Sequence, residues 1–140
     1  MNQTSWDWTE KKTIASKLEC GRDYVDWLVE KLRNYNWPES EVFGIRLALE
    51  EAVVNAMKHG NGLDPDKSVQ LDCRMSSSRF WIQIEDEGTG FDPQDVPDCT
   101  AHENLDKASG RGLLLMKHYM SFVEYNERGN KVVMDKRLPN

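Results

Sequence analysis

One change in hydrophobic spacing, near the middle of the chain, constrains the fold more than any other feature. Between residues 19 and 35, apolar side chains recur every three or four residues, which is the period of an amphipathic helix. Between residues 69 and 84 they alternate with polar neighbours, which is the period of a half-buried strand. The chain is therefore expected to layer helices on a sheet.

Turn and breaker residues divide these regions into elements. A first helix is expected over 19–35, and Pro38 then begins a second helix that runs to about Lys58 and ends at His59-Gly60-Asn61-Gly62. A strand hairpin is expected over 69–84, a helix over 112–120, and a closing hairpin at 122–125 and 131–137. The stretch WTEKKTIAS near the start is expected to form a short edge strand.

This order of elements predicts an α+β fold. Helices would cover one face of a mixed, mainly antiparallel sheet in a two-layer α/β sandwich, and the other face would be free or packed against a partner. The 140 residues fit a single domain, 1–140, that buries an ordinary core without metal or disulfide staples.

Composition excludes several classes of protein. The net charge of -6 disfavours direct binding to nucleic acid or anionic lipid, because both rely on clustered Lys and Arg. No apolar run approaches the ~20 residues of a membrane span. The start, MNQTSWDWTEKK, lacks the features of an export signal, so a cytoplasmic location is expected. Cys20, Cys73 and Cys99 are widely spaced and are expected to be free thiols.

Residues 50–60, EEAVVNAMKHG, carry two polar side chains in an otherwise apolar helical stretch. Glu51 and Asn55 are one turn apart, so both side chains can reach a common point beside the helix. A buried asparagine without partners would cost about 1–3 kcal/mol, which a ligand would have to offset. The alternative is an exposed polar stripe on an amphipathic helix.

A carboxylate and two glycines follow the second strand of the first hairpin, in the sequence EDEGTGF at 85–91. Glycines let the backbone approach a ligand closely, while a carboxylate accepts hydrogen bonds from an exocyclic amine such as that of adenine. A tight turn capped by its own aspartate explains the same residues. A third fingerprint glycine and a GxxxxGK[ST] loop are both missing, which disfavours two common nucleotide folds.

A long segment from Glu87 to Gly110 separates this turn from the next helix. It has little periodicity and exceeds most connections in compact domains, which indicates a functional loop. At its end, SGRG at 109–112 opens into an apolar helix. Free amides at such a helix start form an anion site that suits phosphate, and Arg111 adds charge. The alternative is a flexible loop that meets a core helix.

Histidines and tryptophans give weaker signals. His59 could contact phosphate, although a capping or core role is the preferred interpretation. His102 and His118 lack metal-like spacing, so no zinc site is expected. The tryptophans mark either an exposed partner surface or ordinary packing. They are Trp6, Trp8, Trp27, Trp37 and Trp81.

Taken together, the order and spacing of these segments resemble the GHKL ATPase superfamily, whose fold is the Bergerat ATP-binding sandwich. Within it, the chain is most similar to the small anti-sigma-factor serine kinases of the RsbW and SpoIIAB type. The resemblance spans about Leu18 to Leu138. It is carried by EEAVVNAMKHGN, DEGTGFDP, VPDCTAHENLDKASGRG and GLLLMKHYM.

The resemblance implies a role for each matched residue. Asn55 matches the ligand of magnesium, Glu51 the general base, and Asp86 the carboxylate that receives the adenine amine. Residues 92–109 correspond to the lid over ATP. The other matches are Gly88 and Gly90 at the base pocket, and Gly110, Arg111, Gly112 and Leu113 at the phosphates.

The implied function is an ATP- and Mg²⁺-dependent protein serine kinase that acts as an anti-sigma regulatory factor. It would bind ATP or ADP, together with a sigma factor or an anti-anti-sigma (STAS) protein that it phosphorylates on serine. Relatives commonly pair as homodimers. Two alternatives are a non-catalytic, ATP-sensing binding module and a detached histidine-kinase catalytic domain. One departure concerns residues 129–134, GNKVVM, which lack the threonine that helps many relatives hold adenine.

Overall fold

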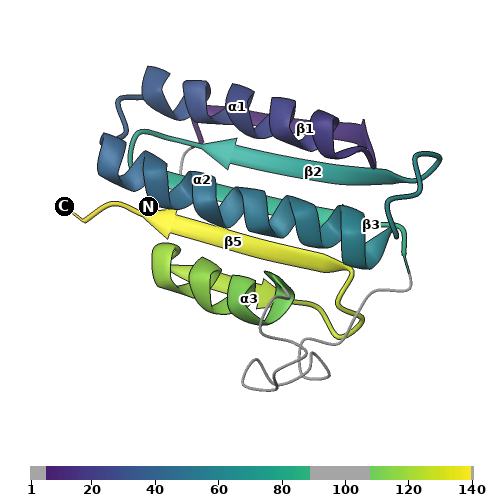
Figure 1. The fold of residues 1–140 in the computed structure, drawn as a ribbon. Coiled ribbons are helices and arrows are strands. Elements are labelled where there is room, and N and C mark those ends of the chain that lie inside the picture. The colour runs from purple at the N-terminus through teal and green to yellow at the C-terminus, as the bar shows by residue number, and fades with distance from the viewer. Residues whose placement is uncertain (1–5, 89–107, 140) are drawn as a thin grey trace.

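The computed structural model describes residues 6–88 and 108–139, and their elements follow the expected order (Figure 1). The edge strand expected near the start is confirmed. The strands are β1 (Trp8–Ala15), β2 (Ser68–Met75), β3 (Arg79–Asp86), β4 (Phe122–Tyr125) and β5 (Lys131–Arg137). The helices are α1 (Leu18–Asn34), α2 (Glu39–Val54) and α3 (Ala108–Tyr119), and a π-helical turn, η1 (Asn55–Gly60), continues α2.

The five strands form one sheet in the order β1-β2-β3-β5-β4. Each pair of neighbouring strands within the described residues is antiparallel, so the parallel pair that a mixed sheet requires is absent from this part of the chain. Local hairpins explain the pattern, because β2 pairs with β3 and β4 pairs with β5. β5 then lies beside β3, with Ile82 opposite Met134.

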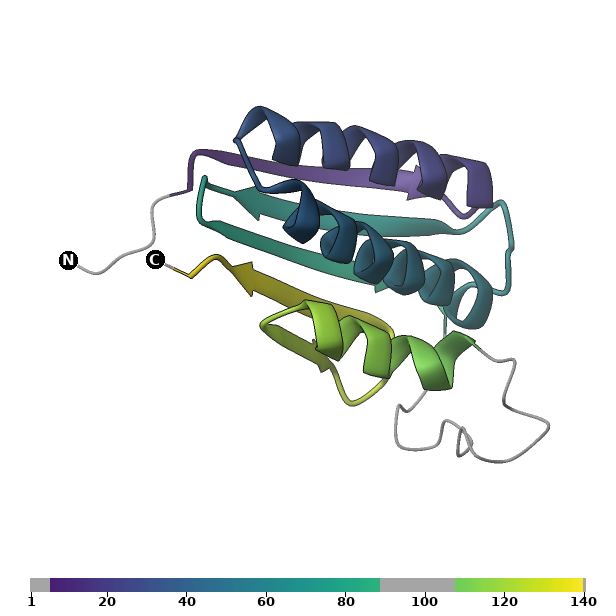
Figure 2. The ribbon, with the colours of Figure 1, turned by 60° about the vertical axis from the view of Figure 1, so that its left-hand side comes forward.

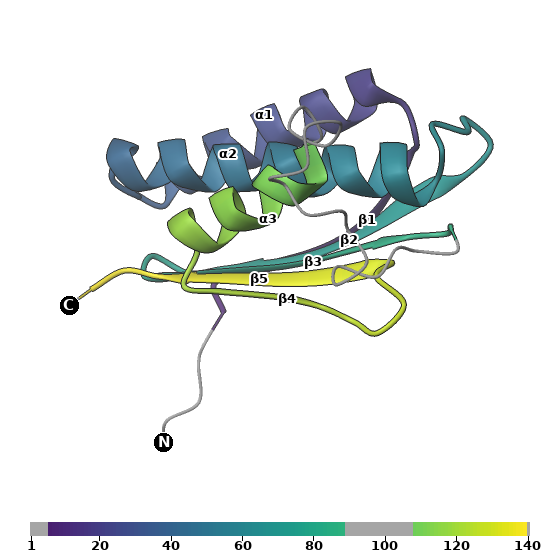
Figure 3. The same ribbon diagram turned by 60° about the horizontal axis from the view of Figure 1, so that its bottom comes forward.

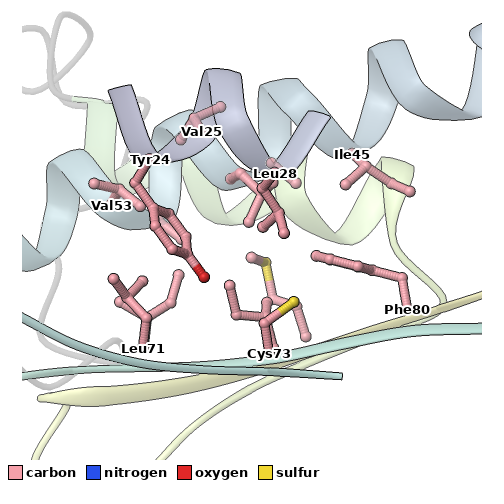
Figure 4. Packing of buried hydrophobic residues seen from close by; sticks show 14 of the residues in the cluster. Tyr24, Val25, Leu28, Ile45, Val53, Leu71, Cys73 and Phe80 are labelled. Carbon is pink, nitrogen blue, oxygen red and sulfur yellow. The ribbon is translucent and has the colours of Figure 1, made fainter. Parts of the chain in front are cut away.

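All three helices cover the same face of the sheet, as Figures 2 and 3 show, which confirms the predicted two-layer α+β sandwich. The apolar faces of helices and strands meet in one core (Figure 4). Leu28 of α1, Ile45 of α2 and Phe80 of β3 are fully buried there. Burial of each such side chain contributes about 1.5–3 kcal/mol.

Two helix boundaries differ from the sequence prediction. The second helix leaves α-helical geometry after Val54 and continues as η1 to Gly60, where an α-helix to Lys58 was expected. A π-helical turn accommodates an extra residue and is frequent at functional sites. α3 begins at Ala108 instead of Gly112, so the second glycine motif lies inside the first turns of the helix. Glycine inside a helix costs only about 1 kcal/mol relative to alanine, which neighbouring residues can offset.

The cysteines, the tryptophans and the helices were each the subject of a further prediction. Cys20 and Cys73 carry free thiols, as expected, and Cys99 lies outside the described residues. Trp37 is a core residue whose indole N–H donates to the Ser76 carbonyl oxygen at 2.9 Å, whereas Trp27 is 39% exposed. Among the described helices, none combines the length and the apolar character needed to cross a membrane.

The described core predicts a large difference between two leucine truncations. Leu28→Ala should lower the free energy of unfolding by about 2–5 kcal/mol, because Leu28 is fully buried between α1 and the sheet. Leu114→Ala should change it by less than about 0.5 kcal/mol, because Leu114 is 63% exposed on α3. Urea unfolding of both variants measures the difference, and equal losses would contradict this packing.

Candidate functional site

The elements that carry the described site residues meet at one end of the sandwich, on the right in Figures 1 and 2. At this end η1 follows α2, β3 ends, α3 begins, and β4 turns back into β5. Close contacts link these elements in pairs. Residues from four separate parts of the sequence therefore line one region.

Glu51, near the end of α2, lies directly against the start of α3. A Cβ atom added to Gly112 would collide with the Glu51 carboxyl group, so only glycine fits here without displacing that group. The Glu51 Oε2 atom is buried and has no hydrogen-bond partner among the described residues. Burial raises the pKa of Glu51, and the nearby charge of Lys58 partly opposes the rise. A carboxylate with a raised pKa and a free oxygen suits a general base.

Asn55, the first residue of η1, is only 1% exposed, so the alternative of an exposed polar stripe is wrong for this residue. Its Nδ2 atom donates to the Tyr125 hydroxyl oxygen at 3.5 Å. Its Oδ1 atom is buried without a hydrogen-bond partner in the described part of the chain. Oxygen atoms are the ligands that Mg²⁺ prefers, so the unpaired oxygen of Asn55 fits a ligand of magnesium.

Asp86, at the end of β3, is held between the turn that follows it and η1. Its Oδ1 atom accepts a hydrogen bond from the Gly88 amide at 2.9 Å, as the alternative of an aspartate-capped turn predicts. A Cβ atom at Gly60 would collide with the Asp86 carboxyl group, and one at Gly88 would collide with the Gly60 carbonyl oxygen. Because both positions are glycine, the backbone of η1 can lie directly against the turn after β3. This close packing also fixes the position of the Asp86 carboxylate.

Burial changes the acidity of Asp86, which is 5% exposed. Its pKa rises from 3.8 to about 6 through burial, although the hydrogen bond from Gly88 opposes the rise. At pH 7 the group is therefore mostly ionised and can accept a hydrogen bond from an amine. A buried carboxylate of this kind favours a ligand that donates hydrogen bonds.

The turn between β4 and β5 packs beside Asp86. The Asp86 N–H donates to the Asn130 carbonyl oxygen at 2.8 Å, and the Asn130 side-chain Nδ2 donates to the Asp86 carbonyl oxygen at 3.4 Å. Asn126 organises the turn, since its Oδ1 accepts from the Asn130 N–H at 3.1 Å. In the stretch without threonine, a buried asparagine thus contacts the residue expected to receive adenine.

The structure describes the other predicted site residues only in part. Gly90 and most of the expected lid, up to residue 107, lie outside the described residues, as does His102. Gly110 and Arg111 belong to the first turn of α3, and only their backbone is described. Leu113 is half-buried and packs against the core. These residues therefore keep the status of predictions.

Sequence reasoning missed three residues that the structure brings into the region. Tyr125 is a half-buried core neighbour at the end of β4, and nothing in the chain pattern indicates that it reaches Asn55. Asn130 lies in the stretch 129–134, for which sequence reasoning noted only the lack of a threonine. The sequence did assign Gly60 to the end of the second helix. Its contact with Asp86, however, follows from the π-helical geometry of η1, which the sequence did not predict.

Comparison with known proteins gives a consistent picture. Residues 14–136 match the family model described as the histidine kinase-like ATPase domain. An anti-sigma F factor of Clostridium perfringens is 32% identical over 104 residues, which cover 70% of this chain and 74% of that protein. The serine-protein kinase RsbW of Bacillus subtilis is 31% identical over 138 residues, covering 89% and 85%. The serine/threonine-protein kinase BtrW of Bordetella bronchiseptica is 27% identical over 122 residues, covering 86% of each.

The raised pKa of Asp86 predicts a pH-dependent effect of Asp86→Asn on stability. Between pH 3.8 and about 6 the folded protein binds this proton more tightly than the unfolded chain does, so the ionised carboxylate destabilises the fold as pH rises. The free energy of unfolding of Asp86→Asn, relative to the parent, should therefore increase from pH 4 to pH 7. Urea unfolding across this range, without nucleotide, measures the change. A difference that stays constant with pH would contradict the buried carboxylate.

Proposed function

Since the chain belongs to the histidine kinase-like ATPase domain family, we propose that it is an ATP- and Mg²⁺-dependent protein serine kinase with an anti-sigma regulatory role. The names of its relatives, anti-sigma F factor and serine-protein kinase, support this role. One observation carries the proposal. Two buried oxygens without hydrogen-bond partners among the described residues, Glu51 Oε2 and Asn55 Oδ1, come from one helix whose end adjoins Asp86.

Recognition of the nucleotide base would depend on Asp86. Its carboxylate would accept a hydrogen bond from the exocyclic amine of adenine, and the close packing of Gly60 and Gly88 would hold that carboxylate in place. Gly90 would complete this pocket, as the family resemblance implies. Asn130 would take the place of the threonine found in many relatives, since it already contacts the backbone of Asp86.

The phosphates would lie toward the start of α3. Asn55 would hold the magnesium ion through Oδ1, and phosphate and water oxygens would complete its coordination. When bound, the ion neutralises the charge that develops on the transferring phosphoryl group. Gly110, Arg111, Gly112 and Leu113 would hold the phosphates at the first turns of α3, and the lid at 92–109 would exclude water.

Glu51 would act as the general base. Its raised pKa strengthens it as a proton acceptor, and the absence of a side chain at Gly112 lets its carboxyl group face the start of α3. It would take the proton from a serine hydroxyl as that oxygen attacks the phosphoryl group. The serine would belong to an anti-anti-sigma (STAS) protein, and a sigma factor would be the alternative, unphosphorylated partner.

Homodimer formation stays a prediction. In the described part of the chain, helices cover only one face of the sheet, as Figure 3 shows. The other face is therefore available to a second copy or to another protein. Size determination in solution would decide between these arrangements.

A matched pair of substitutions tests the role of Glu51. Glu51→Gln should reduce serine phosphorylation by about 10²–10⁴-fold, because the amide cannot accept the proton, while ATP binding should persist. Glu50→Gln, at the exposed neighbouring position, should leave the rate unchanged. The measurement follows labelled phosphate from ATP to purified candidate anti-anti-sigma proteins.

Two results would count against this function. Unchanged phosphorylation by Glu51→Gln would remove Glu51 as the base. Tight ATP binding by the parent protein, with no transfer to any candidate, would instead favour the ATP-sensing binding module.

A further inference from the structure

The hydroxyl group of Tyr125 contacts Asn55 across the site. Asn55 Nδ2 donates to the Tyr125 hydroxyl oxygen at 3.5 Å, which joins the first residue of η1 to the last residue of β4. The other end of the same amide, Asn55 Oδ1, is buried and has no hydrogen-bond partner among the described residues. One end of the amide is thus held, and the oxygen at the other end lacks a hydrogen-bond partner among the described residues.

The fold fixes the position of Tyr125. Tyr125 pairs with Val132 of β5, and its side chain packs against the core on the helix-covered face of the sheet. The hydroxyl group therefore stands at a defined place beside η1. Asn55 is itself 1% exposed, so its side chain is shielded from water.

Hydrogen bonding decides which end of an asparagine amide faces a given neighbour. While Nδ2 donates to Tyr125, the lone pairs of Oδ1 remain available for a cation. The reverse orientation would turn the donor hydrogens toward the cation and repel it. The contact with Tyr125 therefore favours the amide orientation that a magnesium ion requires.

We propose that Tyr125 is a positioning residue for magnesium, and that its hydroxyl oxygen, by accepting the hydrogen bond of Asn55 Nδ2, directs Asn55 Oδ1 toward the ion. The inference rests on the proposed function, because magnesium binding is part of that function. Tyr125 does not contact the ion in this scheme, and it acts on the ion through Asn55.

Tyr125→Phe removes the hydroxyl group and keeps the ring. The Mg²⁺ concentration needed for half-maximal ADP binding should rise about two- to tenfold, which corresponds to the loss of one ordinary hydrogen bond. The affinity for ADP in EDTA should stay unchanged, because the ring still packs in place. Isothermal titration of ADP at a series of Mg²⁺ concentrations measures both values without any turnover.

Tyr24→Phe is the matched control. The Tyr24 hydroxyl is also buried, but it has no hydrogen-bond partner among the described residues and points into the packing around Leu71 and Cys73 (Figure 4). Removing it should change neither the Mg²⁺ dependence nor the affinity in EDTA. A second test adds Tyr125→Phe to Asn55→Asp, whose carboxylate presents oxygen at both ends. There the loss of the hydroxyl should alter the Mg²⁺ dependence little.

The outcomes separate this inference from the proposed function. If the parent protein does not bind ADP with Mg²⁺, the proposed function fails. If the parent binds and Tyr125→Phe keeps its Mg²⁺ dependence, the positioning role is overturned. An equal loss of affinity with and without Mg²⁺, or an undiminished effect in the Asn55→Asp background, would also overturn it.

Discussion

The close contact between η1 and the turn after β3 is the constraint on which the rest of the site depends. Gly60 packs against the Asp86 carboxyl group, and its carbonyl oxygen lies against Gly88, so neither glycine tolerates a side chain. Asn61, which is 2% exposed, secures the junction by accepting the Glu87 N–H at 2.8 Å and donating to the Ser68 carbonyl oxygen at 2.9 Å. These fully paired polar groups hold the helix that carries the proposed base at a fixed position relative to the strand that carries Asp86.

The same region keeps polar groups that the fold leaves unsatisfied within the described residues. Glu51 Oε2 and Asn55 Oδ1 have no hydrogen-bond partners there, and burial raises the pKa of Asp86 to about 6. An unpaired buried polar atom costs about 1–3 kcal/mol, a sizeable part of the ~5–15 kcal/mol by which a domain is stable. A bound magnesium nucleotide would satisfy these atoms, so nucleotide binding should stabilise the fold.

Local patterns predict the elements well but predict their contacts less well. Alternating residues such as Leu71 and Ile82 identify the strands, because one face of each strand is buried. The π-helical geometry of η1 and the contact between Tyr125 and Asn55 depend on how distant segments pack, and no local spacing encodes them. The site residues themselves came from motifs and a family resemblance, and the structure adds which of them lie together.

The central claim is that η1, the turn after β3 and the start of α3 contact one magnesium nucleotide. Amide chemical-shift mapping by NMR tests it most directly, because Gly60, Gly88 and Gly112 report on the three segments separately. Addition of Mg²⁺ and ADP should shift all three glycine amides with a common saturation curve, and should leave Thr9 in β1 unchanged. Shifts at only one of the three glycines, or no shift at any of them, would contradict the shared site.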